Sequence, residues 1–269
     1  ALNNKGVALG QLKKFEEELK AYDEVILRFK DSPDVELKEV VAMALNNKGV
    51  TLGQLNKPEE ALKAYDEVIL RFKDSPDAEL KKRVAIALNN KGVALGQLKK
   101  FEEELKAYDE VILRFKDSPD VELKEVVAMA LNNKGVTLGQ LNKPEEALKA
   151  YDEVILRFKD SPDAELKKRV AIALNNKGVA LGQLNKPEEA LKAYDEVILR
   201  FKDSPDAELK KRVAIALNNK GVALGQLNKP EEALKAFDEV IERFKDSPDT
   251  ELKKQVARAF KNKGKLMKN

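Results

Sequence analysis

The side chains that could carry out catalysis are few in this sequence, and each of them recurs at a fixed spacing. Its 269 residues include no cysteine and no histidine, which excludes disulfides, thiolate metal sites and histidine bases. The serines, such as Ser32 and Ser75, all lie in a repeated DSPD segment. A serine nucleophile needs a base beside it, and these segments supply none. We therefore interpret the serines as helix caps and predict a protein without catalytic residues or enzyme activity.

The acidic residues of the same segments suggest metal binding as a second chemistry. Asp74, Asp77 and Glu79 offer carboxylate oxygens, which are the ligands that Ca²⁺ prefers. The spacing and the glycine of an EF-hand loop are missing, however. Acids at the start of a helix also interact favourably with its positive end. We predict that these acids cap helices, and that the chain has no metal site and no cofactor.

The whole sequence is built from one 43-residue unit. The segment ALNNKGVALGQL at Ala1 recurs, with a single Ala/Thr difference in some copies, and a degraded copy begins at Ala259. Residues 1–86 and 87–172 are identical, which is typical of a designed, consensus-built or very recently amplified array. We predict one continuous solenoid, with residues 259–269 as the polar end of a capping helix. Its six repeats are residues 1–43, 44–86, 87–129, 130–172, 173–215 and 216–258.

Each unit is predicted to contain two amphipathic helices. The longer one starts with Ser75 as its N-cap and Pro76 in its first turn, and ends near Leu98. The shorter one covers Pro58 to Lys73, with a proline and two acids in its first turn. Neither helix can bury its apolar stripe alone, so the helix pairs must stack on one another. The predicted fold is all-α, with stacked antiparallel helix pairs.

The order of these residues resembles the tetratricopeptide-repeat (TPR) pattern. In the second unit, Leu45 stands at the tryptophan position, Gly49 at the glycine and Leu52 at the first tyrosine. Ala61 and Tyr65 match the small residue and the aromatic residue of the second helix. The resemblance covers all six units and implies a right-handed superhelical solenoid. It departs from the family in unit length and in the lysine that precedes each glycine.

The resemblance also implies that the first helix of each pair lines a concave groove. On that helix, one stripe of polar side chains lies opposite the buried Leu88. Carboxamides offer both donors and acceptors, which suit an extended peptide backbone, and guanidinium groups can meet acidic groups. The candidate groove residues are Asn47, Asn90, Asn133, Asn176, Asn219, Gln54, Gln97, Gln140, Gln183, Gln226, Arg83, Arg169 and Arg212.

Two interpretations of this stripe stay open. It either binds a peptide or partner protein in the groove, or merely solvates the first helix while Ile86 and Val93 pack on adjacent helices. The family's dicarboxylate clamp is not reproduced, because Val93 stands where its first asparagine belongs. The function predicted first is a non-catalytic scaffold of the protein–protein interaction type, engineered or consensus-like. The alternative is a natural interaction module that binds an extended peptide.

Charge and hydropathy exclude other partners. The chain has 50 basic and 47 acidic residues, so its net charge gives no reason to expect nucleic acid. The longest apolar runs, such as VVAMAL at Val40, are too short for a membrane span. Together with the absence of a recognisable signal peptide, this leads us to expect a cytoplasmic protein without membrane partners.

The two ends of the array and two glutamates depart from the inner pattern. We expect Phe260, Gly264 and Met267 to face inward at the last helix, and Glu242 to act with nearby lysines as a polar cap. At the first repeat, the stripe with Leu37 and Val41 lacks a partner, which predicts a weak homodimer through that repeat. Glu18 and Glu104 replace an alanine, and we expect them to face solvent or to reach Lys5 and Lys91.

The assignment of helix faces predicts unequal effects of two substitutions in one helix. Leu88→Ala should lower the free energy of unfolding by ~2–5 kcal/mol, because it removes a buried side chain. Asn90→Ala, on the groove face, should cost far less. Chemical denaturation measures both, and equal losses would contradict the assignment.

Overall fold

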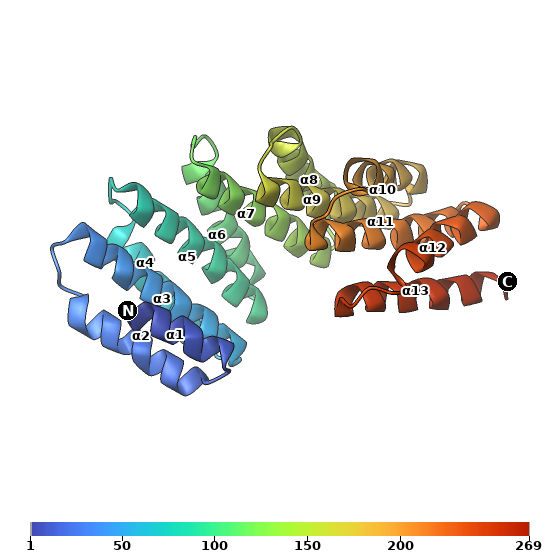
Figure 1. Ribbon diagram of the computed structural model, residues 1–269. Helices are drawn as coiled ribbons and strands as arrows, with labels where there is room; N and C mark the ends of the chain where they lie inside the picture. Colours follow the sequence, from blue (N-terminus) through green and yellow to red (C-terminus); the bar gives the residue numbers. More distant parts are fainter. Residues whose placement is uncertain (1, 269) are drawn as a thin grey trace. The chain divides into compact units, whose positions relative to one another are not determined.

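The computed structural model describes residues 2–268, and this part of the chain is all-α, as predicted. Thirteen helices alternate between a longer and a shorter type without any strand among the described residues (Figure 1). They are α1 (Leu2–Gln11), α2 (Phe15–Phe29), α3 (Val35–Gln54), α4 (Pro58–Phe72), α5 (Ala78–Gln97), α6 (Phe101–Phe115), α7 (Val121–Gln140), α8 (Pro144–Phe158), α9 (Ala164–Gln183), α10 (Pro187–Phe201), α11 (Ala207–Gln226), α12 (Pro230–Phe244) and α13 (Thr250–Leu266).

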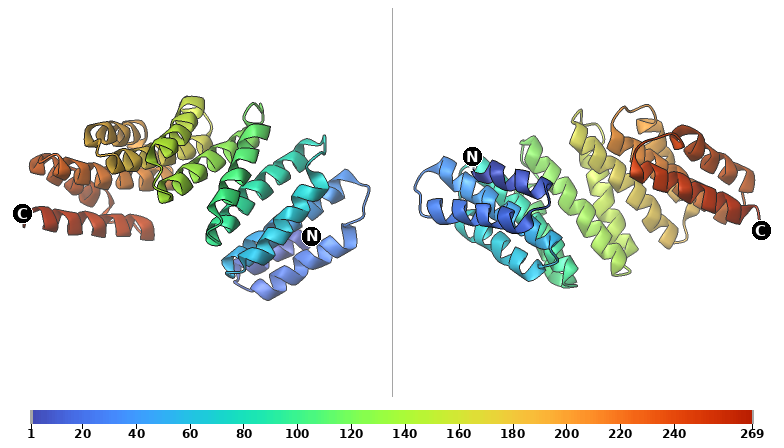
Figure 2. Two further views of the ribbon diagram at one scale, coloured as in Figure 1. Left: turned by 180° about the vertical axis from the view of Figure 1, so that it is seen from behind. Right: turned by 60° about the horizontal axis from the view of Figure 1, so that its bottom comes forward.

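The helices form two compact units, residues 1–134 and 135–269, whose boundary falls within α7. Each helix from α1 to α5 in the first unit, and from α8 to α12 in the second, packs on the next one in the chain (Figure 2). The odd-numbered helices additionally contact one another, α1 with α3 and α3 with α5 in the first unit, α9 with α11 and α11 with α13 in the second. Each unit is therefore a stack of helix pairs whose first helices lie side by side.

The long helices begin two residues later than the sequence suggested, because Asp77 rather than Ser75 is the N-cap. Its carboxylate accepts a hydrogen bond from the Leu80 amide at 2.8 Å. The Ser75 hydroxyl instead accepts one from the Asp77 amide at 3.2 Å and holds the turn before the helix. A carboxylate at the cap is further favoured by the positive helix end.

The turn inside each helix pair is a tight reversal. Asn56 has a φ of 58°, and its amide donates to the Gly53 carbonyl while the Lys57 amide donates to the Leu52 carbonyl. These two bonds are the Schellman arrangement that ends a helix. Asparagine tolerates the left-handed conformation, whereas Lys13 and Lys99 adopt it at the corresponding positions of the first and third repeats.

A glycine on each first helix lets an aromatic ring of the second helix approach its backbone. A Cβ atom added to Gly92 would lie 2.4 Å from Cε1 of Tyr108, and one added to Gly178 would lie 2.3 Å from Cε1 of Tyr194. Such distances are far inside van der Waals contact. The tyrosines are buried, so this contact is at the centre of each helix pair.

The expectation for the last helix is wrong in part. Phe260 and Met267 are 57% and 69% exposed, and nothing lies within 4 Å of a Cβ built on Gly264. In α5 the equivalent Leu88 is buried and lines a depression together with Ala107 of α6, whereas no helix follows α13 within residues 2–268. Glu242 does not replace a buried apolar residue either, because Leu199, its equivalent in the fifth repeat, is 74% exposed.

The first repeat is better covered than its sequence suggested. Val41 is 1% exposed, and the neighbouring Val40 packs against a buried cluster of Tyr22, Val25 and Ala44. Leu37, in contrast, is only half-buried, while its counterpart Leu80 is fully buried. The weak homodimer through this repeat stays a prediction, with a smaller apolar face to support it.

The glycine contact predicts opposite effects of the same substitution within α9. Gly178→Ala should destabilise the protein by about 1–3 kcal/mol, because the new methyl group overlaps the Tyr194 ring. Gly182→Ala meets nothing within 4 Å and should be neutral or stabilising, because alanine favours the helix. Urea denaturation of both variants measures the difference, and a loss of similar size at Gly182 would mean that the ring contact is not the cause.

Candidate functional site

Three cavities open on the face formed by the first helices. Each lies between two neighbouring first helices and has a tyrosine of a second helix as its floor. In the first unit, a cavity of about 260 Å³ lies between α3 and α5 over Tyr65. In the second unit, cavities of about 280 and 310 Å³ lie over Tyr151 and Tyr194. All three repeat the same lining of valine, glutamine, asparagine and tyrosine, so they are copies of one site.

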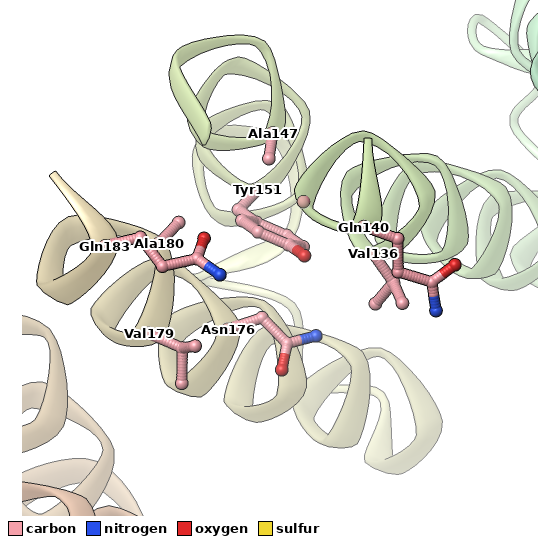
Figure 3. Close-up of a pocket in the computed structure, with 9 residues that line it drawn as sticks. Val136, Gln140, Ala147, Tyr151, Asn176, Val179, Ala180 and Gln183 are labelled. Carbon is pink, nitrogen blue, oxygen red and sulfur yellow. The ribbon is translucent and has the colours of Figure 1, made fainter. Parts of the chain in front are cut away.

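Figure 3 shows the copy over Tyr151. The tyrosine ring points into the space between two first helices, with Asn176 and Gln183 of α9 on one side and Val136 and Gln140 of α7 on the other. Burial raises the pKa of the Tyr151 phenol to about 12. The hydroxyl is therefore protonated at neutral pH and can donate a hydrogen bond.

Most of the polar residues predicted for the groove line these cavities. They are Asn90, Asn176, Asn219, Gln54, Gln97, Gln140, Gln183 and Gln226. Asn47 and Asn133 occupy the same helix position and are half-buried, but they are not among the lining residues of the three cavities. The Nδ2 group of Asn133 donates to Oδ1 of Asn89 at 3.2 Å. Val93 lines a cavity as well.

The predicted arginines lie apart from the cavities. Arg83, Arg169 and Arg212 are half-buried on the first helices and belong to none of the three linings. Arg212 forms an ion pair with Glu208, one turn earlier in α11. Their predicted role toward acidic ligand groups stays a prediction.

The first asparagine of several NN doublets has a role that sequence reasoning missed. Asn46 is buried, and its Nδ2 group donates to the backbone carbonyl of Arg83 on the next first helix at 3.0 Å. Asn175 and Asn218 make the same bond to the carbonyls of Arg212 and Gln255, at 3.1 and 3.0 Å. Consecutive residues of a helix point about 100° apart, so one asparagine ties neighbouring helices while the other faces the cavity.

Glu18 and Glu104 are buried, contrary to our expectation. Glu18 is 6% exposed, and its Oε1 atom accepts hydrogen bonds from the Tyr22 hydroxyl at 3.0 Å and from the Thr51 hydroxyl at 2.9 Å. Glu104 accepts from the Tyr108 hydroxyl at 3.1 Å. Sequence reasoning overlooked these hydroxyl donors, which compensate in part for the loss of water around the carboxylates.

The glutamates occupy the place that is open in the other repeats. A Cβ atom on Gly10 would lie 2.7 Å from the Glu18 carboxylate, whereas one on Gly53, Gly139 or Gly182 would meet nothing within 4 Å. The residue that faces this place from the following first helix differs between repeats with a glutamate and repeats with an alanine. Repeats with a glutamate are followed by Thr51 or Thr137, and those with Ala61, Ala147 or Ala190 by Ala94, Ala180 or Ala223, whereas Ala233 of the sixth repeat is followed by Leu266. The chain therefore contains filled and open versions of one site.

Ion pairs fix the helices outside the cavities. A lysine that precedes each first-helix glycine reaches an aspartate on the preceding second helix, as in Lys91–Asp66 at 2.7 Å and Lys220–Asp195 at 2.6 Å. Within residues 2–268, no cluster of acidic side chains could hold a metal ion. No helix in that part of the chain has the length and apolar character of a membrane span.

Stacked helix pairs with recurring pockets on the first-helix face define a helical-repeat protein of the solenoid class. Three family models, each described as tetratricopeptide repeat, match residues 46–120, 127–159 and 169–246, together more than half of the chain. The chain belongs to the tetratricopeptide-repeat family, which consists of non-catalytic repeat scaffolds for protein–protein interaction. No curated protein sequence matches it.

Solved structures share this fold at low sequence identity. BtubC from P. vanneervenii is 15% identical with a TM-score of 0.68, and the match covers 95% of this chain and 93% of that one. The apo form of RapI is 14% identical with a TM-score of 0.67, covering 100% and 98%. NprR in complex with its cognate peptide NprX is 14% identical with a TM-score of 0.54, covering 98% and 71%.

The buried carboxylate predicts a stability loss where the sequence suggested none. Glu18→Ala should cost about 1–3 kcal/mol, because the Tyr22 hydroxyl loses its acceptor and the Thr51 hydroxyl keeps only the Asn47 carbonyl. Glu18→Ala combined with Thr51→Ala recreates the pair found at Ala61 and Ala94, and should cost less than the sum of the single changes. Denaturation of the double-mutant cycle measures the coupling. The exposed Glu16→Ala is the control, and strict additivity would show that the Glu18–Thr51 contact contributes nothing.

Proposed function

We infer that this chain is a non-catalytic interaction scaffold whose first-helix face binds an extended peptide segment of a partner protein. The observation that carries this inference is the recurrence of one cavity over Tyr65, Tyr151 and Tyr194 with the same polar and apolar lining. Carboxamides around an apolar pocket are suited to a peptide, because they bond its backbone while the pocket takes a side chain.

The size and spacing of the cavities support a peptide rather than a small molecule. Volumes of about 260–310 Å³ lie at or below the lower limit of drug-sized sites, which suits a single side chain. Packed helices are about 8–10 Å apart, and an extended chain rises about 3.3 Å per residue. The neighbouring cavities over Tyr151 and Tyr194 would therefore take side chains about three residues apart. Such side chains share one face in an extended peptide of the polyproline II type, which has three residues per turn.

Two further observations support the proposal. The fold of NprR, whose structure contains its cognate peptide NprX, is similar to that of this chain. The identity of residues 1–86 and 87–172 supports a consensus-built or recently amplified array, in which one site is repeated with little change.

Peptide-library panning against the folded protein tests the proposal. Bound peptides should lose at least tenfold in affinity on the double change Asn176→Ala and Asn219→Ala, because each removes the carboxamide of one cavity. Leu199→Glu is the matched control: it lies on an exposed face, and the sixth repeat already has Glu242 there. Fluorescence anisotropy gives the affinities. If no peptide is enriched, the groove proposal is wrong and the chain is a scaffold only.

A further inference from the structure

The cavity over Tyr194 differs from the others by a positive charge. Arg258 of α13 stands where inner repeats have Ile86, Ile172 or Ile215. Its Nη2 group donates a hydrogen bond of 2.8 Å to Oδ1 of Asn219, which lines this cavity. The guanidinium is exposed and fixed beside the cavity, so a bound group can pair with it.

The charge of Arg258 acts on the floor of the cavity. The pKa of the Tyr194 phenol is raised to about 12, mainly because burial disfavours the phenolate, and Arg258 acts in the opposite direction. The lining contains no acidic side chain that could neutralise this field. A negative group in the cavity would therefore be attracted electrostatically, and a positive group repelled.

The first repeat shows what such a negative group does in this place. There the Glu18 carboxylate lies against Gly10 and accepts a hydrogen bond from the Tyr22 hydroxyl. At the corresponding positions of the fifth repeat stand Ala190, Gly182 and Tyr194, all of which line the cavity. The space near Gly182 is open, since a Cβ atom there would meet nothing within 4 Å.

We propose that the cavity over Tyr194 is a pocket for an acidic side chain of the bound peptide, an inference that rests on the function proposed above. Its carboxylate takes the place that Glu18 holds in the first repeat, accepts a hydrogen bond from the Tyr194 hydroxyl and is balanced by Arg258. The neighbouring cavity over Tyr151 has the same lining but Ile215 at the Arg258 position. It serves as an internal reference without the charge.

Peptides selected by panning test this pocket when each is compared with a version whose acidic residues are changed to the corresponding amides. The native protein should bind the acidic peptide about tenfold to a hundredfold more tightly, as expected for a hydrogen-bonded ion. Arg258→Ile, which installs the residue of the inner repeats, should reduce this ratio to near one while leaving the affinity of the amide version unchanged.

A second variant fills the pocket with the chain's own carboxylate. Ala190→Glu with Ala223→Thr recreates the Glu18–Thr51 pair of the first repeat, so it is compatible with the fold, and it should also abolish the preference for the acidic peptide. The control, Ala147→Glu with Ala180→Thr, fills the cavity over Tyr151 and should leave the ratio unchanged. Circular dichroism and denaturation confirm that each variant is folded.

The outcomes separate this inference from the proposed function. If peptides bind but the native protein does not distinguish acid from amide, the acidic pocket is wrong and the peptide groove stands. A preference that survives Arg258→Ile, or that is lost only when the cavity over Tyr151 is filled, also overturns the assignment to Tyr194. If no peptide binds at all, both proposals fail.

Discussion

The contact between a bare glycine and an aromatic ring sets the geometry on which the other features depend. Because Gly178 has no side chain, the Tyr194 ring can lie against the helix backbone, and the two helices of the pair close on each other. The same ring extends to the first-helix face, where it forms the floor of a cavity. One packing requirement therefore determines both the helix pair and the depth of the pocket. Phe237 keeps this packing in the sixth repeat but lacks the hydroxyl.

A single position on the second helix determines whether a pocket is open. Alanine at Ala61 or Ala190 leaves the space above the tyrosine empty, whereas Glu18 fills it with a carboxylate held by two hydroxyls. The paired change on the next first helix follows from hydrogen bonding, because a buried carboxylate without the Thr51 donor would be poorly compensated. Near-identical repeats thus present an uneven surface, and Arg258 adds a charge at one place only.

The local pattern of the sequence predicted those structural features that depend on a single helix pair. The apolar periodicity identified the helices, and the offsets of Gly49 and Tyr65 gave the family register before any contact was known. Features that arise between repeats were not predictable in this way. Glu18 is buried because Thr51, 33 residues later, comes beside it on stacking, and Phe260 is exposed because no helix within residues 2–268 covers it. The NN doublet indicated a polar stripe, but only the stacking separates its two asparagines into different roles.

Where the first asparagine of a doublet bonds to the next first helix, its acceptor is a backbone carbonyl, and this has a consequence for how such arrays grow. Asn3, Asn46 and Asn218 donate to the carbonyls of a valine, an arginine and a glutamine, respectively. The acceptor is present whatever side chain the next repeat carries, so this bond places no demand on the identity of the accepting residue. Repeats that differ on their exposed faces can then be duplicated, deleted or shuffled by recombination without a matching change at this bond, whereas a buried glutamate such as Glu18 still requires its threonine in the next repeat. Variation at the exposed positions of the surface is therefore independent of this one bond between repeats.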